Sequence, residues 1–102
     1  MKIIKYLSDR MSEELDDACG YIESAIEYKS TFPEVAELLA RLSNEEMNHM
    51  KLLHAQAERL IAEERKKGEP PAEMMAVYNY LHKKQMDKSA RIVAKQTVYK
   101  EM

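Results

Sequence analysis

Apolar residues recur every three or four positions along most of the chain, which is the spacing of one face of an α-helix. The first such segment begins near residue 3, or at Ser12 if its first turns fray, and ends near Lys29. Its apolar positions are Leu7, Met11, Leu15, Ala18, Ile22, Ala25 and Ile26. The pattern therefore predicts an amphipathic helix with one buried face.

A second periodic segment runs from about residue 32 to Lys67, with apolar positions at Val35, Leu38, Leu39, Leu42, Leu53, Ala57, Leu60 and Ile61. Thr31 and Glu34 have the spacing of a capping box, and Pro33 suits a first helical turn. Gly68 follows three basic residues, as expected at a helix C-terminus. At 1.5 Å per residue this helix would be roughly 50 Å long. A compact chain of this size has a radius of gyration of only about 13 Å, so we expect an elongated molecule.

A third helix is predicted from near Pro71 to about Lys100. Its apolar positions are Met74, Tyr78, Leu81, Ile92 and Tyr99, and polar residues interrupt them at Gln85, Ser89 and Gln96. The sequence thus predicts one all-α domain, with an antiparallel helical hairpin over residues 1–68 and a C-terminal helix over residues 69–102. A hairpin leaves one apolar face uncovered. We therefore expect the third helix and a second copy of the chain to cover it, so that a homodimer or larger homo-oligomer forms a four-helix bundle.

Charge and cysteine content exclude several classes of function. The 102 residues carry a net charge of −2, which argues against binding to nucleic acid. The single cysteine, Cys19, cannot form an internal disulfide, which fits a reducing cytoplasm. No segment approaches the roughly 20 apolar residues that cross a bilayer, and the apolar run at the start is too short for a signal peptide.

Two helices carry ionisable residues in or beside their apolar stripes. At about 100° per residue, Glu46 and His49 point nearly the same way as Leu42, whereas Met47 points away. Glu14 falls at the edge of the first stripe, and Tyr21 follows in almost the same direction. Because the apolar faces of neighbouring helices must meet, we expect Glu14, Tyr21, Glu46 and His49 to converge.

Burying two glutamates side by side is costly, because their charges lose water and repel each other. A metal ion removes both costs, and carboxylates with imidazole suit iron, manganese or zinc. A Glu-x-x-His pair with a lone glutamate on the neighbouring helix is half of a carboxylate-bridged di-iron site. The sequence therefore predicts that Glu14, Glu46 and His49 bind metal between two copies of the chain.

Other interpretations of these residues stay open. Glu46 and His49 have the spacing of an ordinary surface pair on a helix, and Glu14 could pair with a lysine or arginine at the rim. The protein would then be a helical interaction protein with a structural or vestigial metal site. Its partner would meet the mildly basic C-terminal helix. His54 and His82 are expected in solvent or at a helix contact.

The joint spacing of these residues resembles the ferritin-like superfamily, specifically its rubrerythrin-type and short encapsulated-ferritin-type members. The matching pattern is Glu14, then Tyr21 after six residues, then Glu46-x-x-His49 on the next helix, within about residues 8 to 65. The resemblance implies a two-helix half-site that dimerises around iron, with Glu14, Glu46 and His49 as ligands and Tyr21 near the site. It also implies oxidation of ferrous iron by oxygen or peroxide, or peroxide reduction. A looser likeness is to small ferritin-like proteins of bacterial prophages. With one cysteine, the chain has no rubredoxin-like module.

Overall fold

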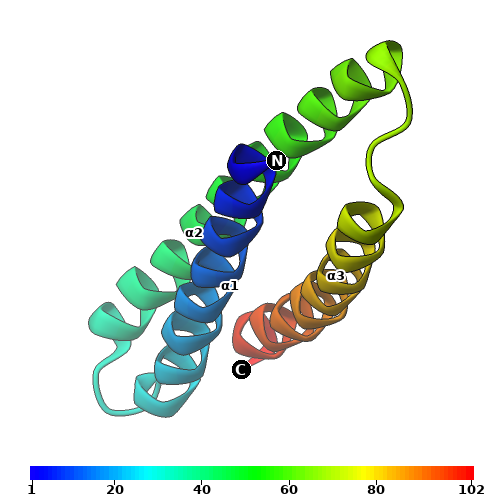
Figure 1. The fold of residues 1–102 in the computed structure, drawn as a ribbon. Helices are drawn as coiled ribbons and strands as arrows, with labels where there is room; N and C mark the ends of the chain where they lie inside the picture. Colours follow the sequence, from blue (N-terminus) through cyan, green and yellow to red (C-terminus); the bar gives the residue numbers. More distant parts are fainter.

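The computed structural model describes residues 1–102 as three helices, with no strand: α1 (Lys2–Tyr28), α2 (Pro33–Lys67) and α3 (Ala72–Glu101). Helices α1 and α2 lie side by side and antiparallel, and α3 turns back to run parallel to α1 (Figure 1). The all-α class and the three helices are confirmed, with bounds close to the predicted ones. The molecule measures 55 × 18 × 17 Å and its radius of gyration is 16.3 Å, so the predicted elongated shape is confirmed as well.

The main core lies between α1 and α2, and Ile92 and Tyr99 of α3 pack against it. The predicted stripe of α1 is buried, and Ile26 at its end is half-buried. Facing it, α2 presents small side chains, Ala36, Ala40 and Ser43, which let the two helices approach closely. At this contact the hydroxyl of Ser43 donates a hydrogen bond of 2.7 Å to the carbonyl of Ala18.

The buried face of α2 differs from the prediction in the first half of the helix, whereas Ala57 and Ile61 in the second half are buried as predicted. Val35 and Leu38, which were expected in the core, are 50% and 51% exposed, whereas Met47, which was expected to point away, is only 5% exposed. The face of small residues packs against α1 because closer approach brings more atoms into contact. As a result, much of the leucine-rich face at the start of α2 is left on the surface.

The ends of α2 give one wrong and one confirmed prediction. The capping box is wrong: Phe32 is the N-cap residue, with no side-chain cap bond, although Pro33 does open the first turn. Gly68 ends the helix as predicted, with φ of +137°, which favours glycine. Its N–H donates to the carbonyl of Arg65.

Helix α3 is attached mainly to α1. Its buried residues recur every seven positions: Tyr78, Gln85, Ile92 and Tyr99. The polar interruptions at Gln85 and Gln96 are cross-helix contacts. The amide of Gln85 donates to the carbonyl of Ser8 and to the hydroxyl of Ser12, both at 2.9 Å. That of Gln96 donates to the hydroxyl of Ser43 at 3.0 Å.

A pair of histidines joins α3 to α2. The rings of His54 and His82 stack with their centroids 4.6 Å apart, so both residues lie at a helix contact, one of the two places expected. The ring of Tyr78 also stacks on that of His82, with the centroids 5.9 Å apart. None of the three helices has an apolar stretch long enough to span a membrane.

Candidate metal centre

The structure brings Glu14 of α1 together with Glu46 and His49 of α2. One potential ligand atom from each of the three side chains lies within 4.8 Å of the others. The Nδ1 atom of His49 is 3.3 Å from Oε2 of Glu14 and 3.7 Å from Oε2 of Glu46. Two donor atoms that each lie about 2.1 Å from one ion are roughly 3–4 Å apart. These donors therefore have nearly the spacing that a single ion needs.

The three side chains of the cluster become more exposed in the order Glu14, Glu46, His49. The side chain of Glu14 is 9% exposed, that of Glu46 is 18% exposed and that of His49 is 54% exposed. The expectation that His49 lies inside a buried stripe is wrong within the single chain, because α2 turns Met47 and Met50 into the core instead. The cluster is thus anchored in the core and open at the surface.

Glu14 and Glu46 favour a single proton shared between them, because the pair shifts the pKa values of its two carboxyls in opposite directions. The pKa of Glu46 is raised to about 7, first by its hydrogen bond to Glu14, then by burial and by the negative charge of that residue. The same bond, accepted by the ionised Glu14, is the main reason that the pKa of Glu14 is lowered, and His49 and Arg10 contribute. A cation that displaced the proton would relieve the repulsion between the two carboxylates.

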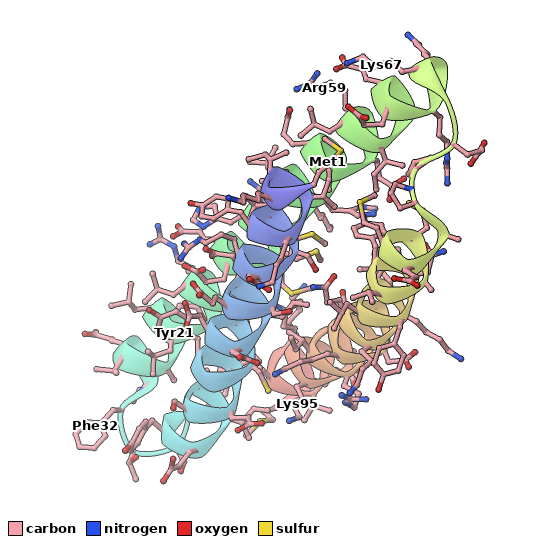
Figure 2. All side chains as sticks on the ribbon, in the orientation of Figure 1. Met1, Tyr21, Phe32, Arg59, Lys67 and Lys95 are labelled. Atoms are coloured by element: carbon pink, nitrogen blue, oxygen red, sulfur yellow. The ribbon has the colours of Figure 1, made fainter.

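The cluster faces away from α3. On α1, Asp16 and Glu23 form ion pairs with lysines of α3. Glu14 and Tyr21 each precede one of these acids by two residues, which is about 200° around the helix. Figure 2 shows Tyr21 and Lys95 of α3 on opposite sides of α1. The donors therefore lie on the side of the α1–α2 pair that α3 leaves open.

Exposed apolar residues flank the cluster on this side. Ile3 and Leu38 lie eleven residues before Glu14 and His49 respectively, so each points within about 20° of its cluster residue. Both are about half exposed. We define the cluster face as this surface of α1 and α2, made by Ile3, Arg10, Glu14, Tyr21, Tyr28, Val35, Leu38, Glu46 and His49.

The expected alternative, that Glu14 pairs with a lysine or arginine, is confirmed, and the partner that sequence reasoning did not name is Arg10. One of its terminal nitrogens donates to Oε1 of Glu14 at 3.1 Å, and the other pairs with Glu13. The i,i+4 spacing of Arg10 and Glu14 was the available signal. Tyr21 is half-buried, and its hydroxyl forms no side-chain hydrogen bond in the structure, so a role for Tyr21 near the site stays a prediction.

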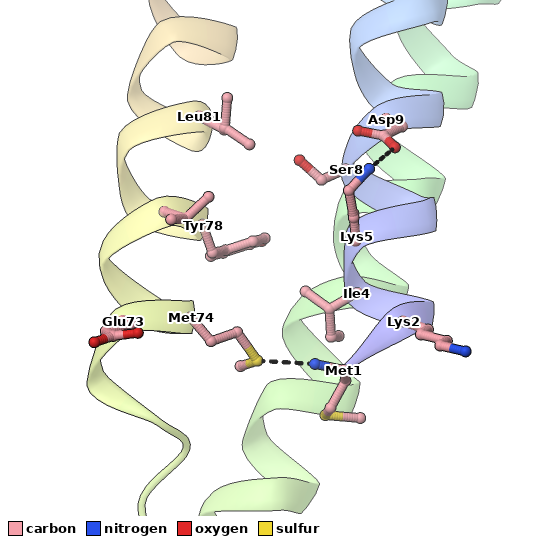
Figure 3. A pocket seen from close by; sticks show the side chains of 11 residues that line it. Met1, Lys2, Ile4, Lys5, Ser8, Asp9, Glu73, Met74, Tyr78 and Leu81 are labelled. Carbon is pink, nitrogen blue, oxygen red and sulfur yellow. Dashed lines mark hydrogen bonds and ion pairs between the residues drawn. The ribbon is translucent and has the colours of Figure 1, made fainter.

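The other candidate features lie away from the cluster. The largest cavity, about 480 Å³, is formed by the first turns of α1 and α3, where Ile4 faces Met74 and Tyr78 (Figure 3). It is about 15 Å along α1 from Glu14. Burial raises the pKa of the Cys19 thiol, which disfavours the reactive thiolate.

The donor set is therefore one imidazole and two carboxylates. These ligand types suit iron, manganese and zinc, and three donors leave at least one coordination position open. Comparison of the chain with protein-family models, curated proteins and solved structures finds no match. What can be inferred about function therefore rests on the residues and their geometry.

Proposed function

We propose that the protein binds iron, or manganese in its place, through Glu14, Glu46 and His49. The observation that carries the proposal is the spacing of the three donors. They come from two helices. Nδ1 of His49 lies 3.3 Å from the carboxylate of Glu14 and 3.7 Å from that of Glu46, and each carboxylate disfavours a second negative charge beside it. Such an arrangement has the chemistry of a cation site.

A second copy of the chain would complete the centre. Two cluster faces related by a twofold axis would supply four carboxylates and two imidazoles, the ligand set of a di-iron bundle. The cluster face runs along most of a molecule 55 Å long, and a standard interface needs about 800 Å² from each partner. The exposed Val35 and Leu38 would then be buried, as the sequence pattern predicts.

The residues have distinct roles in this proposal. Glu14 and Glu46 would offset the charge of the ions, and His49 would add one neutral donor for each ion. Iron bound in such a centre would supply the redox chemistry for oxidising ferrous iron with oxygen or peroxide. The apolar residues of the cluster face would limit the access of water to the ligands once two copies meet.

The proposal is tested by metal content and mass in solution. Untagged protein is incubated with ferrous iron without oxygen, desalted and analysed for metal, and its mass is measured by light scattering. About one ion per chain in an even-numbered oligomer is expected. Glu14→Gln and His49→Ala should lose the metal, and the exposed control Glu63→Gln should keep it. A wild-type chain that retains neither iron nor manganese would refute the proposal.

An interaction protein without a working metal site is the second candidate function. It is favoured by the fact that Glu14 already has partners in Arg10, His49 and the shared proton. In that case α3, with six positive and three negative side chains in residues 70–102, would meet an acidic partner. The same metal analysis separates the two candidates, because only the first requires bound metal.

A further inference from the structure

The guanidinium of Arg10 occupies one oxygen of the most buried ligand. It donates to Oε1 of Glu14 at 3.1 Å, while Oε2 of the same carboxylate faces His49 at 3.3 Å. The two oxygens of Glu14 therefore point to different partners. Only the Oε2 side looks into the cluster.

Arg10 also has a second ion-pair partner. Its other terminal nitrogen is bonded to Glu13, an exposed acid that is not part of the cluster. If the guanidinium gave up Glu14, it would keep this partner and stay in contact with water. Release of Oε1 therefore does not leave a buried, unpaired cation, which would be costly.

The competition concerns how the carboxylate binds metal. A carboxylate that bridges two ions uses both oxygens, whereas one held by an arginine offers a single oxygen. The guanidinium also repels an approaching cation at short range. Arg10 thus weakens metal binding in two ways, by occupying Oε1 and by its positive charge. Glu13 reduces both effects, because it offers the guanidinium another partner and offsets its charge.

We propose that Arg10 is a gate on the metal centre: it holds Oε1 of Glu14 until the incoming cation displaces the guanidinium, which then keeps only its bond to Glu13. This inference deepens the proposed function and rests on it. Arg10 is a positioning residue here, since it acts on the metal only through Glu14. Its effect should appear in the affinity for metal, independently of any turnover.

The test is titration of the metal-free protein with Mn²⁺, followed by calorimetry, because Mn²⁺ does not oxidise readily during the measurement. Arg10→Gln should bind Mn²⁺ about tenfold more tightly, the scale of one hydrogen bond to a charged group. Glu13→Gln should bind it about threefold more weakly, since an exposed pair contributes less. The two variants thus move in opposite directions.

Two controls separate gating from charge alone. Arg59→Gln breaks a similar i,i+4 pair, that of Arg59 with Glu63 at 2.8 Å, away from the cluster, and should leave the affinity unchanged. Asp17→Asn removes one exposed acid near Glu46 and should weaken binding less than Glu13→Gln. In about 0.5 M NaCl a long-range charge effect would be screened, whereas competition for Oε1 would persist.

The outcomes distinguish the gate from the metal centre. Tighter binding by Arg10→Gln that survives high salt supports the gate. Equal or weaker binding by this variant, with the wild type still binding Mn²⁺, overturns the gate and leaves the metal centre standing. If neither protein binds Mn²⁺ or ferrous iron, both proposals fail together. If only Arg10→Gln binds metal, the wild-type metal centre is refuted, and the gate fails with it, because the gate requires an incoming cation to displace Arg10 in the wild type.

Discussion

In the metal-free protein, Glu46→Gln should increase the free energy of unfolding at pH 8 by about 1–2 kcal/mol. At this pH the wild-type chain must hold Glu14 and Glu46 both ionised, side by side and partly buried. A glutamine amide carries no charge. It can also donate to Glu14 the hydrogen bond that protonated Glu46 donates.

The size of the expected change in the free energy of unfolding follows from the shared proton. Because the pKa of Glu46 rises from 4.5 to about 7, the folded chain binds more protons than the unfolded chain between these values. Its stability therefore falls as the pH rises through this range. At about 1.4 kcal/mol per pH unit, the upper limit is about 3.4 kcal/mol. The lowered pKa of Glu14 offsets part of this, and Glu46 retains some contact with water, which leaves about 1–2 kcal/mol.

The assay is urea unfolding with a chelator present, at pH 8 and at pH 5, for the wild type, Glu46→Gln and Glu45→Gln. The last variant removes the same charge from an exposed neighbouring position and should change stability by less than about 0.5 kcal/mol. At pH 5 the wild type already carries the proton, so the advantage of Glu46→Gln should nearly vanish. The shared proton would be refuted if Glu46→Gln were less stable than the wild type at pH 8, or if its gain in free energy of unfolding were the same at both pH values.

Two further predictions concern α3. Ile92→Ala should lower the free energy of unfolding by about 2–5 kcal/mol, because Ile92 is fully buried in the main core. Val93→Ala, at an exposed position, should cost less than about 0.5 kcal/mol in the same urea titration. Burial and the charge of His54 lower the pKa of His82, although Glu58 opposes this. The unfolded chain therefore takes up the proton first, and stability falls as the pH drops below about 6.5. In His82→Phe the thermal midpoint should fall less between pH 7.5 and 5.5 than in the wild type, and an equal fall would contradict the role of His82.

The positions of the three helices could be predicted from the sequence because the signals are local. A period of 3.6 residues, a proline in the first turn of α2 and a glycine after its last turn act within a few residues of the chain. The stripe of α1 was predicted almost completely, since this helix has one clear apolar face. The same periodicity indicated that Glu46 and His49 share a side of α2.

The convergence of Glu14 with Glu46 and His49 was also predicted, but only as a consequence of two apolar faces meeting. The structure brings the three side chains together by a different packing. Small residues of α2 contact α1, and the glutamates meet at the edge of that contact. This is why His49 is open to the surface rather than inside the core.

What the sequence by itself determined is therefore the set of helices and the residues that share each helical face. Only the tertiary structure decided which face of α2 is buried, because α2 carries two apolar faces and the choice depends on how closely α1 can approach each. It also decided that Gln85 anchors α3 rather than interrupting its packing, and that Arg10 holds Glu14. Such choices depend on the fit between surfaces far apart in the chain, and a local pattern contains no information about that fit.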